Sequence, residues 1–103
     1  MTSVHGITTG TIEQDAILIE PHAPHKATFA AFTLVLDQHD PDKRAMRVSV
    51  ALFGNVCHRE LQNLIAGRRV TVSGRVQPKA VSGGDGRWYG ELSIATGNVE
   101  FEN

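Results

Sequence analysis

Hydrophobic and polar residues alternate along much of the chain, a pattern typical of strands that bury one face. Residues 46–53 show the alternation most clearly. One face of this expected strand carries Val48, Val50 and Leu52. The opposite face carries Arg47, Ser49, Ala51 and Phe53. We expect the aliphatic face to lie in the core and the second face to point outward.

Four further segments have strand character and are bounded by turn-forming residues. They are residues 6–19, 27–36, 69–77 and 87–96, followed by a last short extended piece, NVEFE. The residues that we expect them to bury are Phe32, Leu34, Leu36, Val70, Val72, Val76, Leu92 and Ile94. Gly10 lies inside the first segment, and a glycine within a strand often marks a bulge or a close backbone approach. The sequence SGGDG at residues 82–86 predicts a hairpin connection.

Only the segment between the third and fourth strands has helical spacing. Asn55 is the expected N-cap and Gly67 the expected C-terminal stop. The apolar residues on one face of this helix are Cys57, Leu61, Leu64 and Ile65. The pattern therefore predicts a short helix that is buried along one side.

This order of elements predicts an all-β fold: a five-stranded OB-fold Greek-key barrel with one short α-helix between strands 3 and 4. In such a barrel the helix covers one open end. A five-stranded SH3-like barrel with an incidental helix is the structural alternative. The chain has 103 residues, of which 41% are hydrophobic, and this suits a single OB-fold domain spanning residues 1–103.

The cysteine content and the hydropathy limit where the protein acts. Cys57 is the only cysteine, so no disulfide can form within the chain, and the sequence does not begin with a secretory signal pattern. No segment approaches the roughly 20 apolar residues that a membrane helix needs. We therefore expect a soluble, cytoplasmic protein that has no membrane partner.

The formal net charge of −1 hides an uneven distribution of charge along the chain. Residues 1–42 carry one basic and six acidic side chains, whereas residues 43–87 carry nine basic and two acidic ones. The basic side chains could be scattered and solvated, which is the simpler interpretation. The alternative is a basic stripe that faces a polyanion.

Four stretches of the chain carry motifs in a characteristic order. They are GITTGTI (6–12), FTLVLD (32–37), VSVALFGNVCHRELQNLIAGRRVTVSGRV (48–76) and DGRWYGELSI (85–94). The residues at motif positions are Gly10, Phe53, Gly54, Gly67, Val70, Val72, Gly74, Trp88, Glu91 and Phe101. By the order and spacing of these motifs, most of the chain resembles the bacterial single-stranded DNA-binding protein family.

The resemblance implies an OB-fold that binds single-stranded DNA without strong sequence preference. It also implies a homo-oligomer, a dimer or tetramer formed through the first strands, and roles in DNA replication, repair and recombination. Members of the family recruit replication proteins through an acidic tail that ends in proline and phenylalanine. Because the sequence ends in EFEN, we expect a divergent member that lacks this tail.

The chain departs from the family at the residues that stack on bases. Arg47 stands where the family has a tryptophan on the third strand, Val81 stands at a second such position, and the third falls near His39. Phe53 keeps a stacking position. The guanidinium of Arg47 can itself stack on a base or contact phosphate. Because each base–aromatic stack is worth roughly 1–3 kcal/mol, we expect weak, salt-sensitive binding.

The candidate nucleic-acid-binding residues come from the outer strand faces, the adjoining hairpin and the start of the basic segment. They are Arg47, Phe53, Arg75, Lys79, Arg87, Tyr89, Lys43 and Arg44. An alternative place for Phe53 is beneath a loop or at a subunit contact. Trp88 shares its strand parity with Leu92 and Ile94, which favours the core or the barrel rim over a stacking surface for bases. Arg68 and Arg69 lie at a helix-to-strand corner, where solvated charges or charges at the helix C-terminus are the usual interpretation and phosphate contact is the alternative.

No metal ligand set or catalytic arrangement is recognisable. The histidines His22 and His25 and the Cys57-His58 pair have no second pair at ligand spacing, so we expect no metal and no cofactor. The leading interpretation is a non-catalytic binder of single-stranded DNA. The alternative is an OB-fold protein-interaction module of a replication or primosome-like complex, with weak or no DNA binding. A third class, a small-ligand or accessory barrel, stays open because the net charge is not basic.

Overall fold

The computed structural model describes residues 4–22, 24, 27–36, 46–82 and 88–102. Side chains are described for these residues except 4, 79–82 and 88–91. The predicted contact residues Lys43, Arg44 and Arg87 lie outside the described residues.

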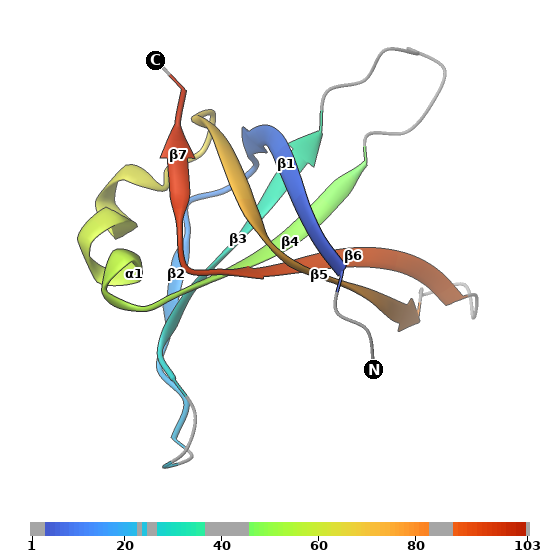
Figure 1. Cartoon of the computed structure of the whole chain (residues 1–103), viewed down its shortest axis with the longest axis horizontal. Coiled ribbons are helices and arrows are strands. Elements are labelled where there is room, and N and C mark those ends of the chain that lie inside the picture. Colours follow the sequence, from blue (N-terminus) through green and yellow to red (C-terminus); the bar gives the residue numbers. More distant parts are fainter. Residues whose placement is uncertain (1–3, 23, 25–26, 37–45, 83–87, 103) are drawn as a thin grey trace.

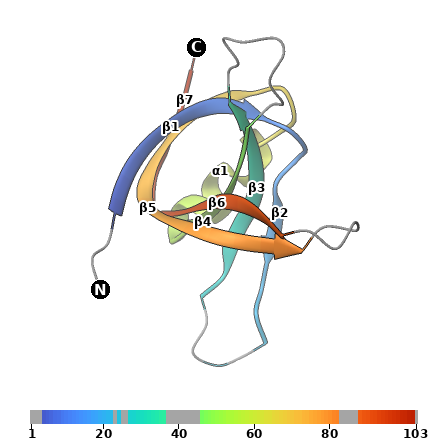
Figure 2. The same cartoon turned by 90° about the vertical axis from the view of Figure 1, so that its right-hand side faces the viewer.

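The described residues form seven strands, five of which close into a barrel (Figures 1 and 2). The five are β1 (Val4–Ile12), β3 (Phe29–Leu36), β4 (Arg47–Phe53), β5 (Arg69–Ser82) and β6 (Trp88–Thr96). They follow the order β1-β3-β4-β6-β5, and β5 pairs with β1 to close the ring. Strands β4 and β6 run parallel, and the other neighbours run antiparallel. The predicted five-stranded OB-fold barrel is therefore confirmed.

The first predicted strand, residues 6–19, is divided into two strands. Strand β1 ends at Ile12, and β2 (Ile17–Ile19) pairs with β3. Near its end β1 pairs with β5 and β3 at once, at Gly10. A Cβ atom on Gly10 would lie 2.7 Å from the carbonyl oxygen of Val35. The glycine thus marks a close backbone approach at the point where the barrel closes.

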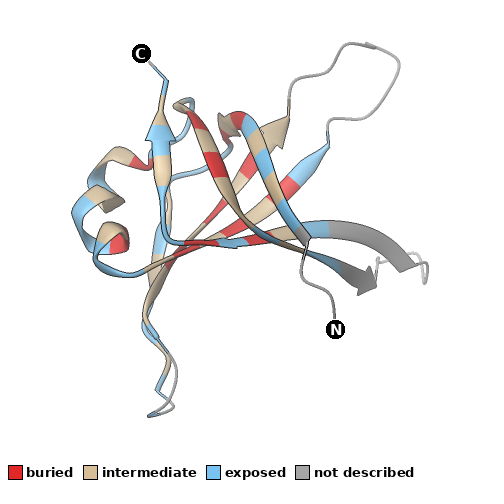
Figure 3. Cartoon of the chain, viewed as in Figure 1, coloured by how far each residue is buried: buried red, intermediate tan, exposed pale blue. Residues whose placement is uncertain are grey.

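Buried positions recur along the barrel strands, and these residues form the core (Figure 3). The buried hydrophobic residues are Ile12, Ala30, Phe32, Leu34, Val48, Val50, Leu52, Cys57, Leu64, Val70, Val72 and Ile94. The predicted alternation holds, with Leu36 and Val76 partly buried against this core. The prediction for Leu92 is wrong, since this residue is 38% exposed. It is the first residue of β6 that pairs with β4, whereas the preceding ones pair with β5, so it lies at the barrel rim.

The helix lies between β4 and β5, as predicted. It consists of α1 (Asn55–Glu60) and a 3₁₀ turn, η1 (Leu61–Asn63). Cys57 and Leu64 are buried in the core, and Figure 2 shows the helix behind the opening of the barrel. Ile65, which was predicted to share this face, is 45% exposed because α-helical spacing ends with α1. The helical segment therefore covers one end of the barrel with fewer apolar side chains than its sequence spacing predicted.

Glycines with positive φ stand at both ends of the helical segment. Gly54, with a φ of 87°, precedes Asn55, which is the first helical residue rather than the predicted N-cap. Gly67, with a φ of 89°, follows the segment where the sequence predicted its end. No helix in the described part of the chain is long and apolar enough to cross a membrane.

Candidate nucleic-acid interface

Small side chains line the centre of the outer face of the barrel. The strand register makes Ala31, Ala51 and Ala95 successive partners across β3, β4 and β6. Ser49 and Ser93 form a second pair beside them. Because these side chains are short, they leave a groove of about 330 Å³, which we call the central groove. The groove is also lined by Phe29, Phe53, Gln77 and the core residues Val50 and Ile94.

Two phenylalanines stand side by side at one end of the central groove. Phe29 of β3 and Phe53 of β4 are register partners, and their ring centroids lie 5.1 Å apart with a 39° tilt. Both rings are half-buried. The alternation in β4 correctly predicted that Phe53 points outward. Sequence reasoning did not consider Phe29, although its parity, opposite to that of Phe32 and Leu34, could have identified it.

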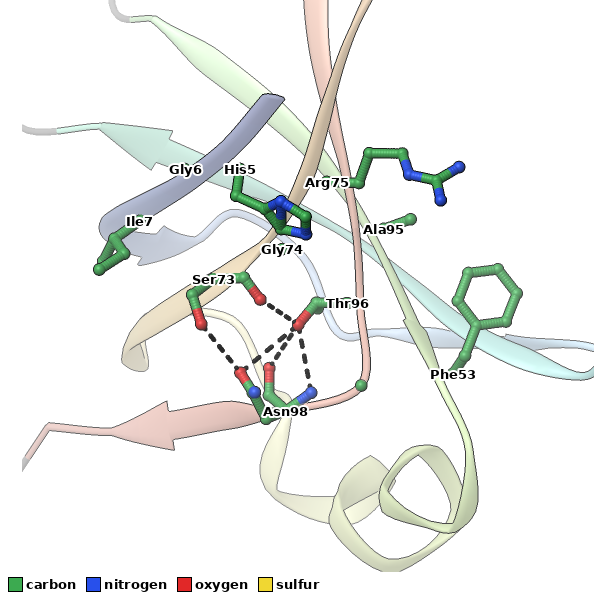
Figure 4. A pocket seen from close by; sticks show the side chains of 11 residues that line it. His5, Gly6, Ile7, Phe53, Ser73, Gly74, Arg75, Ala95, Thr96 and Asn98 are labelled. Atoms are coloured by element: carbon green, nitrogen blue, oxygen red, sulfur yellow. Dashed lines mark hydrogen bonds between the residues drawn. The ribbon is translucent and has the colours of Figure 1, made fainter. Parts of the chain in front are cut away.

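Beyond Phe53 and Ala95 the central groove opens into a larger hollow of about 1040 Å³, which we call the Arg75 hollow (Figure 4). Arg75 reaches it from β5, while His5 and Ile7 reach it from β1. Arg75 is exposed and makes no ion pair with any residue in the part of the chain that the structure describes. The hollow therefore presents a cation that is available to a ligand.

A hydrogen-bond network fixes the floor of the Arg75 hollow (Figure 4). The buried hydroxyl of Thr96 donates to the carbonyl oxygen of Ser73, and the Ser73 hydroxyl donates to Asn98 Oδ1 at 3.2 Å. The Asn98 N–H donates to the Thr96 hydroxyl oxygen, also at 3.2 Å. A Cβ atom on Gly74 would lie 2.3 Å from the carbonyl oxygen of Ala95, so β5 and β6 meet closely here. These contacts hold the two strands that carry Arg75 and Ala95 together.

A third hollow, of about 310 Å³, adjoins the central groove at its other end, and we call it the Glu13 hollow. It shares Ala31, Ser49 and Val50 with the central groove, and its other lining residues include Glu13 and Asp15. Arg47 lies beside it on the outer face of β4, as the alternation predicted. Its Nε donates to Glu13 Oε2 at 2.5 Å, with side-chain exposures of 55% for Arg47 and 35% for Glu13. The guanidinium of Arg47 is therefore paired with the Glu13 carboxylate.

The other predicted contact residues are placed only in part. Lys79 lies in β5 and Tyr89 in β6, but their side chains are not described. Arg68 packs over the ring of Phe101, with its guanidinium carbon 4.6 Å from the ring centroid. Arg69 donates to Glu102 at 2.7 Å. Both contacts link the doublet to β7 (Val99–Phe101) and the residue after it, rather than to the end of the helix, which the sequence suggested.

The described residues contain no group of three or more His, Cys, Asp or Glu side chains that could hold a metal ion. Cys57, beside the exposed His58, is buried against the core. Its thiol lies 3.9 Å from the carbonyl oxygen of Thr28. Cys57 thus acts as a packing residue of the helical segment.

Comparison with solved structures relates the barrel to known proteins. No protein-family model and no curated protein sequence matches the chain. The crystal structure of a small single-stranded DNA-binding protein from Streptomyces coelicolor superposes with a TM-score of 0.78 at 13% identity, covering 99% of this chain and 96% of that one. A Plasmodium falciparum SSB in complex with ssDNA superposes with a TM-score of 0.67, also at 13% identity, covering 96% and 94%. The chain therefore has the OB-fold that its sequence motifs predicted.

Proposed function

We propose that the protein binds single-stranded DNA, without strong sequence preference and without catalysis, in the central groove and the Arg75 hollow. The observation that carries this proposal is the continuity of the two spaces across the outer face of the barrel. They bring an aromatic pair, a floor of small residues and an exposed arginine together. The two similar solved structures support the proposal, because both are single-stranded DNA-binding proteins and one is a complex with ssDNA.

The chemistry of the groove suits an unpaired strand. Proteins that bind single strands combine aromatic side chains, on which bases stack, with cations that follow the phosphates. Phe53, supported by Phe29, supplies the stacking surface, and Arg75 supplies a phosphate contact. The alanines of the floor let a flat base lie close to the sheet. We also propose as DNA contacts the remaining residues that the sequence predicted, which are Lys79, Tyr89, Arg87, Lys43 and Arg44.

The affinity expected from these groups is modest. One stacking surface contributes roughly 1–3 kcal/mol. Each phosphate contact adds electrostatic free energy that salt removes, with a slope of about −0.7 in log K against log salt for single strands. We therefore propose micromolar binding that weakens steadily as the salt concentration rises.

A titration of labelled oligo(dT) tests the proposal directly. The anisotropy of the labelled strand is followed as protein is added at several salt concentrations. Micromolar or tighter binding that falls as salt rises supports the proposal. Absence of binding even at low salt contradicts it. Duplex DNA of the same length serves as the control, because paired bases cannot stack on Phe53.

The free edge of β1 supports a homo-oligomer, a dimer or tetramer, as part of the same proposal. Among the described residues, Val4 to Thr9 pair with β5 alone, so the other edge of β1 is open. Ile7 on this stretch is 78% exposed. Light scattering of the protein and of Ile7→Lys tests this point, and we expect a smaller mass for the variant. A cytoplasmic setting and replication proteins as partners accompany the proposal.

The second candidate function is a protein-interaction module. The exposed residues Ile17 and Ile19 favour it, since they are 64% and 37% exposed on the short strand β2. Apolar side chains in that position can contact a protein partner as well as nucleic acid. The oligo(dT) titration separates the two functions, because an interaction module binds DNA weakly or not at all.

A further inference from the structure

The two ends of the outer face differ in charge, because carboxylates line the Glu13 hollow and an arginine lines the Arg75 hollow. The Glu13 hollow shares Ala31, Ser49 and Val50 with the central groove, and the central groove shares Phe53 and Ala95 with the Arg75 hollow. The three spaces therefore form one continuous path. A strand of DNA that follows this path meets an arginine at each end, but only one of the two arginines is bound to a carboxylate.

The turn that carries Glu13 is fixed from both sides. The Glu13 N–H donates to the carbonyl oxygen of Thr33 at 2.9 Å. Two residues later, an Asp15 carboxylate oxygen accepts the Ala66 N–H, also at 2.9 Å. The backbone of the turn is thus tied to β3 on one side and to the segment after the helix on the other. The Glu13 carboxylate is thereby kept beside the outer face of β4.

Arg47 and Phe53 belong to the same face of β4. They are six positions apart along the strand, which corresponds to about 20 Å. A strand stacked on Phe53 and running along β4 therefore leads toward Arg47. A phosphate that arrives there meets the Glu13 carboxylate, which already occupies the Nε donor of Arg47, offsets its positive charge and repels a second anion.

We propose that Glu13 is an affinity-determining residue that competes with DNA phosphate for Arg47. By this competition it confines the bound strand to the central groove and the Arg75 hollow. The inference rests on the proposed function, since it assumes that single-stranded DNA lies along this face. It assigns to Arg47 a phosphate contact that the Glu13 carboxylate weakens.

The test compares Glu13→Gln with Asp15→Asn in the oligo(dT) titration. Both variants remove one negative charge from the same turn, but only Glu13 is paired with Arg47. We expect Glu13→Gln to bind roughly two- to fivefold more tightly at low salt, with a salt slope steeper by about 0.7 because one more phosphate contact forms. Asp15→Asn keeps an oxygen acceptor for Ala66, and its salt slope should stay that of the wild type.

The Arg47→Ala substitution completes a double-mutant cycle. We expect it to change wild-type affinity less than twofold and to abolish the gain in the Glu13→Gln background. Thermal unfolding of each variant checks that the barrel remains folded. A Glu13→Gln protein that binds like a DNA-binding wild type overturns the inference. Equal gains and slopes for Glu13→Gln and Asp15→Asn overturn it as well, since they indicate general charge repulsion.

The outcomes separate the inference from the proposed function. Binding by Glu13→Gln without any binding by the wild type contradicts the proposed function, and it overturns the inference too, because the expected gain is only two- to fivefold. Absence of binding by both proteins at low salt overturns the inference together with the proposed function. Binding by the wild type without any effect of Glu13 leaves the proposed function standing and removes only the inference.

Discussion

The two arginines of the outer face differ in what surrounds them, although both follow the outward parity of their strands. Arg75 stands in a wide hollow beside His5 and Ile7 and makes no ion pair with a described residue. Arg47 stands beside the turn after β1 and is paired with Glu13. The difference teaches that strand alternation places a cation on the surface, whereas a neighbouring element decides whether the cation is available.

A side chain added between β5 and β6 should have the largest effect, because it disturbs the strand that carries Arg75. The Gly74→Ala substitution places a Cβ atom 2.3 Å from the carbonyl oxygen of Ala95, so the two strands must separate. Overpacking of this kind costs about 1–3 kcal/mol or more of unfolding free energy. Urea denaturation measures the loss. The control is Gly97→Ala, because a Cβ atom at that position meets no atom within 4 Å. Equal stability of the two variants would contradict the close approach.

Removing the stacking surface between the two ends should have the largest effect on binding itself. We expect Phe53→Ala to lose about 2 kcal/mol of binding free energy, or roughly thirtyfold in affinity. Anisotropy titrations with oligo(dT) give the ratio. Ile65→Ala is the matched control, since this apolar residue is 45% exposed and does not line the groove. Wild-type affinity in Phe53→Ala would show that the aromatic pair does not contact bases.

Neutralising the available arginine should sharpen the comparison. Arg75→Ala removes a charge-assisted phosphate contact, which corresponds to about tenfold weaker binding at low salt and a salt slope shallower by roughly 0.7. The same titrations at several salt concentrations measure both quantities. Arg59→Ala on α1 removes the same charge outside the groove and serves as the control. If both variants lose affinity equally, the effect comes from net charge alone.

Neutralising the engaged arginine should have the smallest effect. We expect Arg47→Ala to change DNA affinity less than twofold, because its guanidinium is held by Glu13. An exposed ion pair contributes about 0–1 kcal/mol to stability. The substitution should therefore lower the unfolding free energy by no more than this amount. Titration and urea denaturation of one sample measure the two values. A tenfold loss of affinity would place Arg47 on a par with Arg75.

The barrel could be predicted from the sequence because alternation is a local property of each strand. Val48, Val50 and Leu52 are buried as their period of two requires. Predictions failed at element ends, where spacing no longer describes the backbone. Ile65 follows a 3₁₀ turn rather than another helical turn, and Leu92 lies where β6 leaves the barrel.

The candidate site could be predicted only in part, because its contacts join residues that are distant in sequence. The parity of Phe53 and Arg75 was correct, but the contact between Phe29 and Phe53 depends on the register of β3 against β4. The pairing of Arg47 with Glu13 depends on the turn after β1. No local pattern encodes that turn, since the sequence suggested one continuous strand through it.

The pairing of β1 with β5 has a consequence for how the protein is made. Strand β1 begins at Val4, whereas its partner β5 begins at Arg69, so the ring closes between distant parts of the chain. Contacts of such long sequence separation slow folding, because the loop between them must be ordered first. During synthesis β1 emerges early and cannot pair with β5 until most of the chain has left the ribosome. Strand β1 therefore lacks its β5 partner, and can pair with other nascent chains, until the second half of the chain has been synthesised.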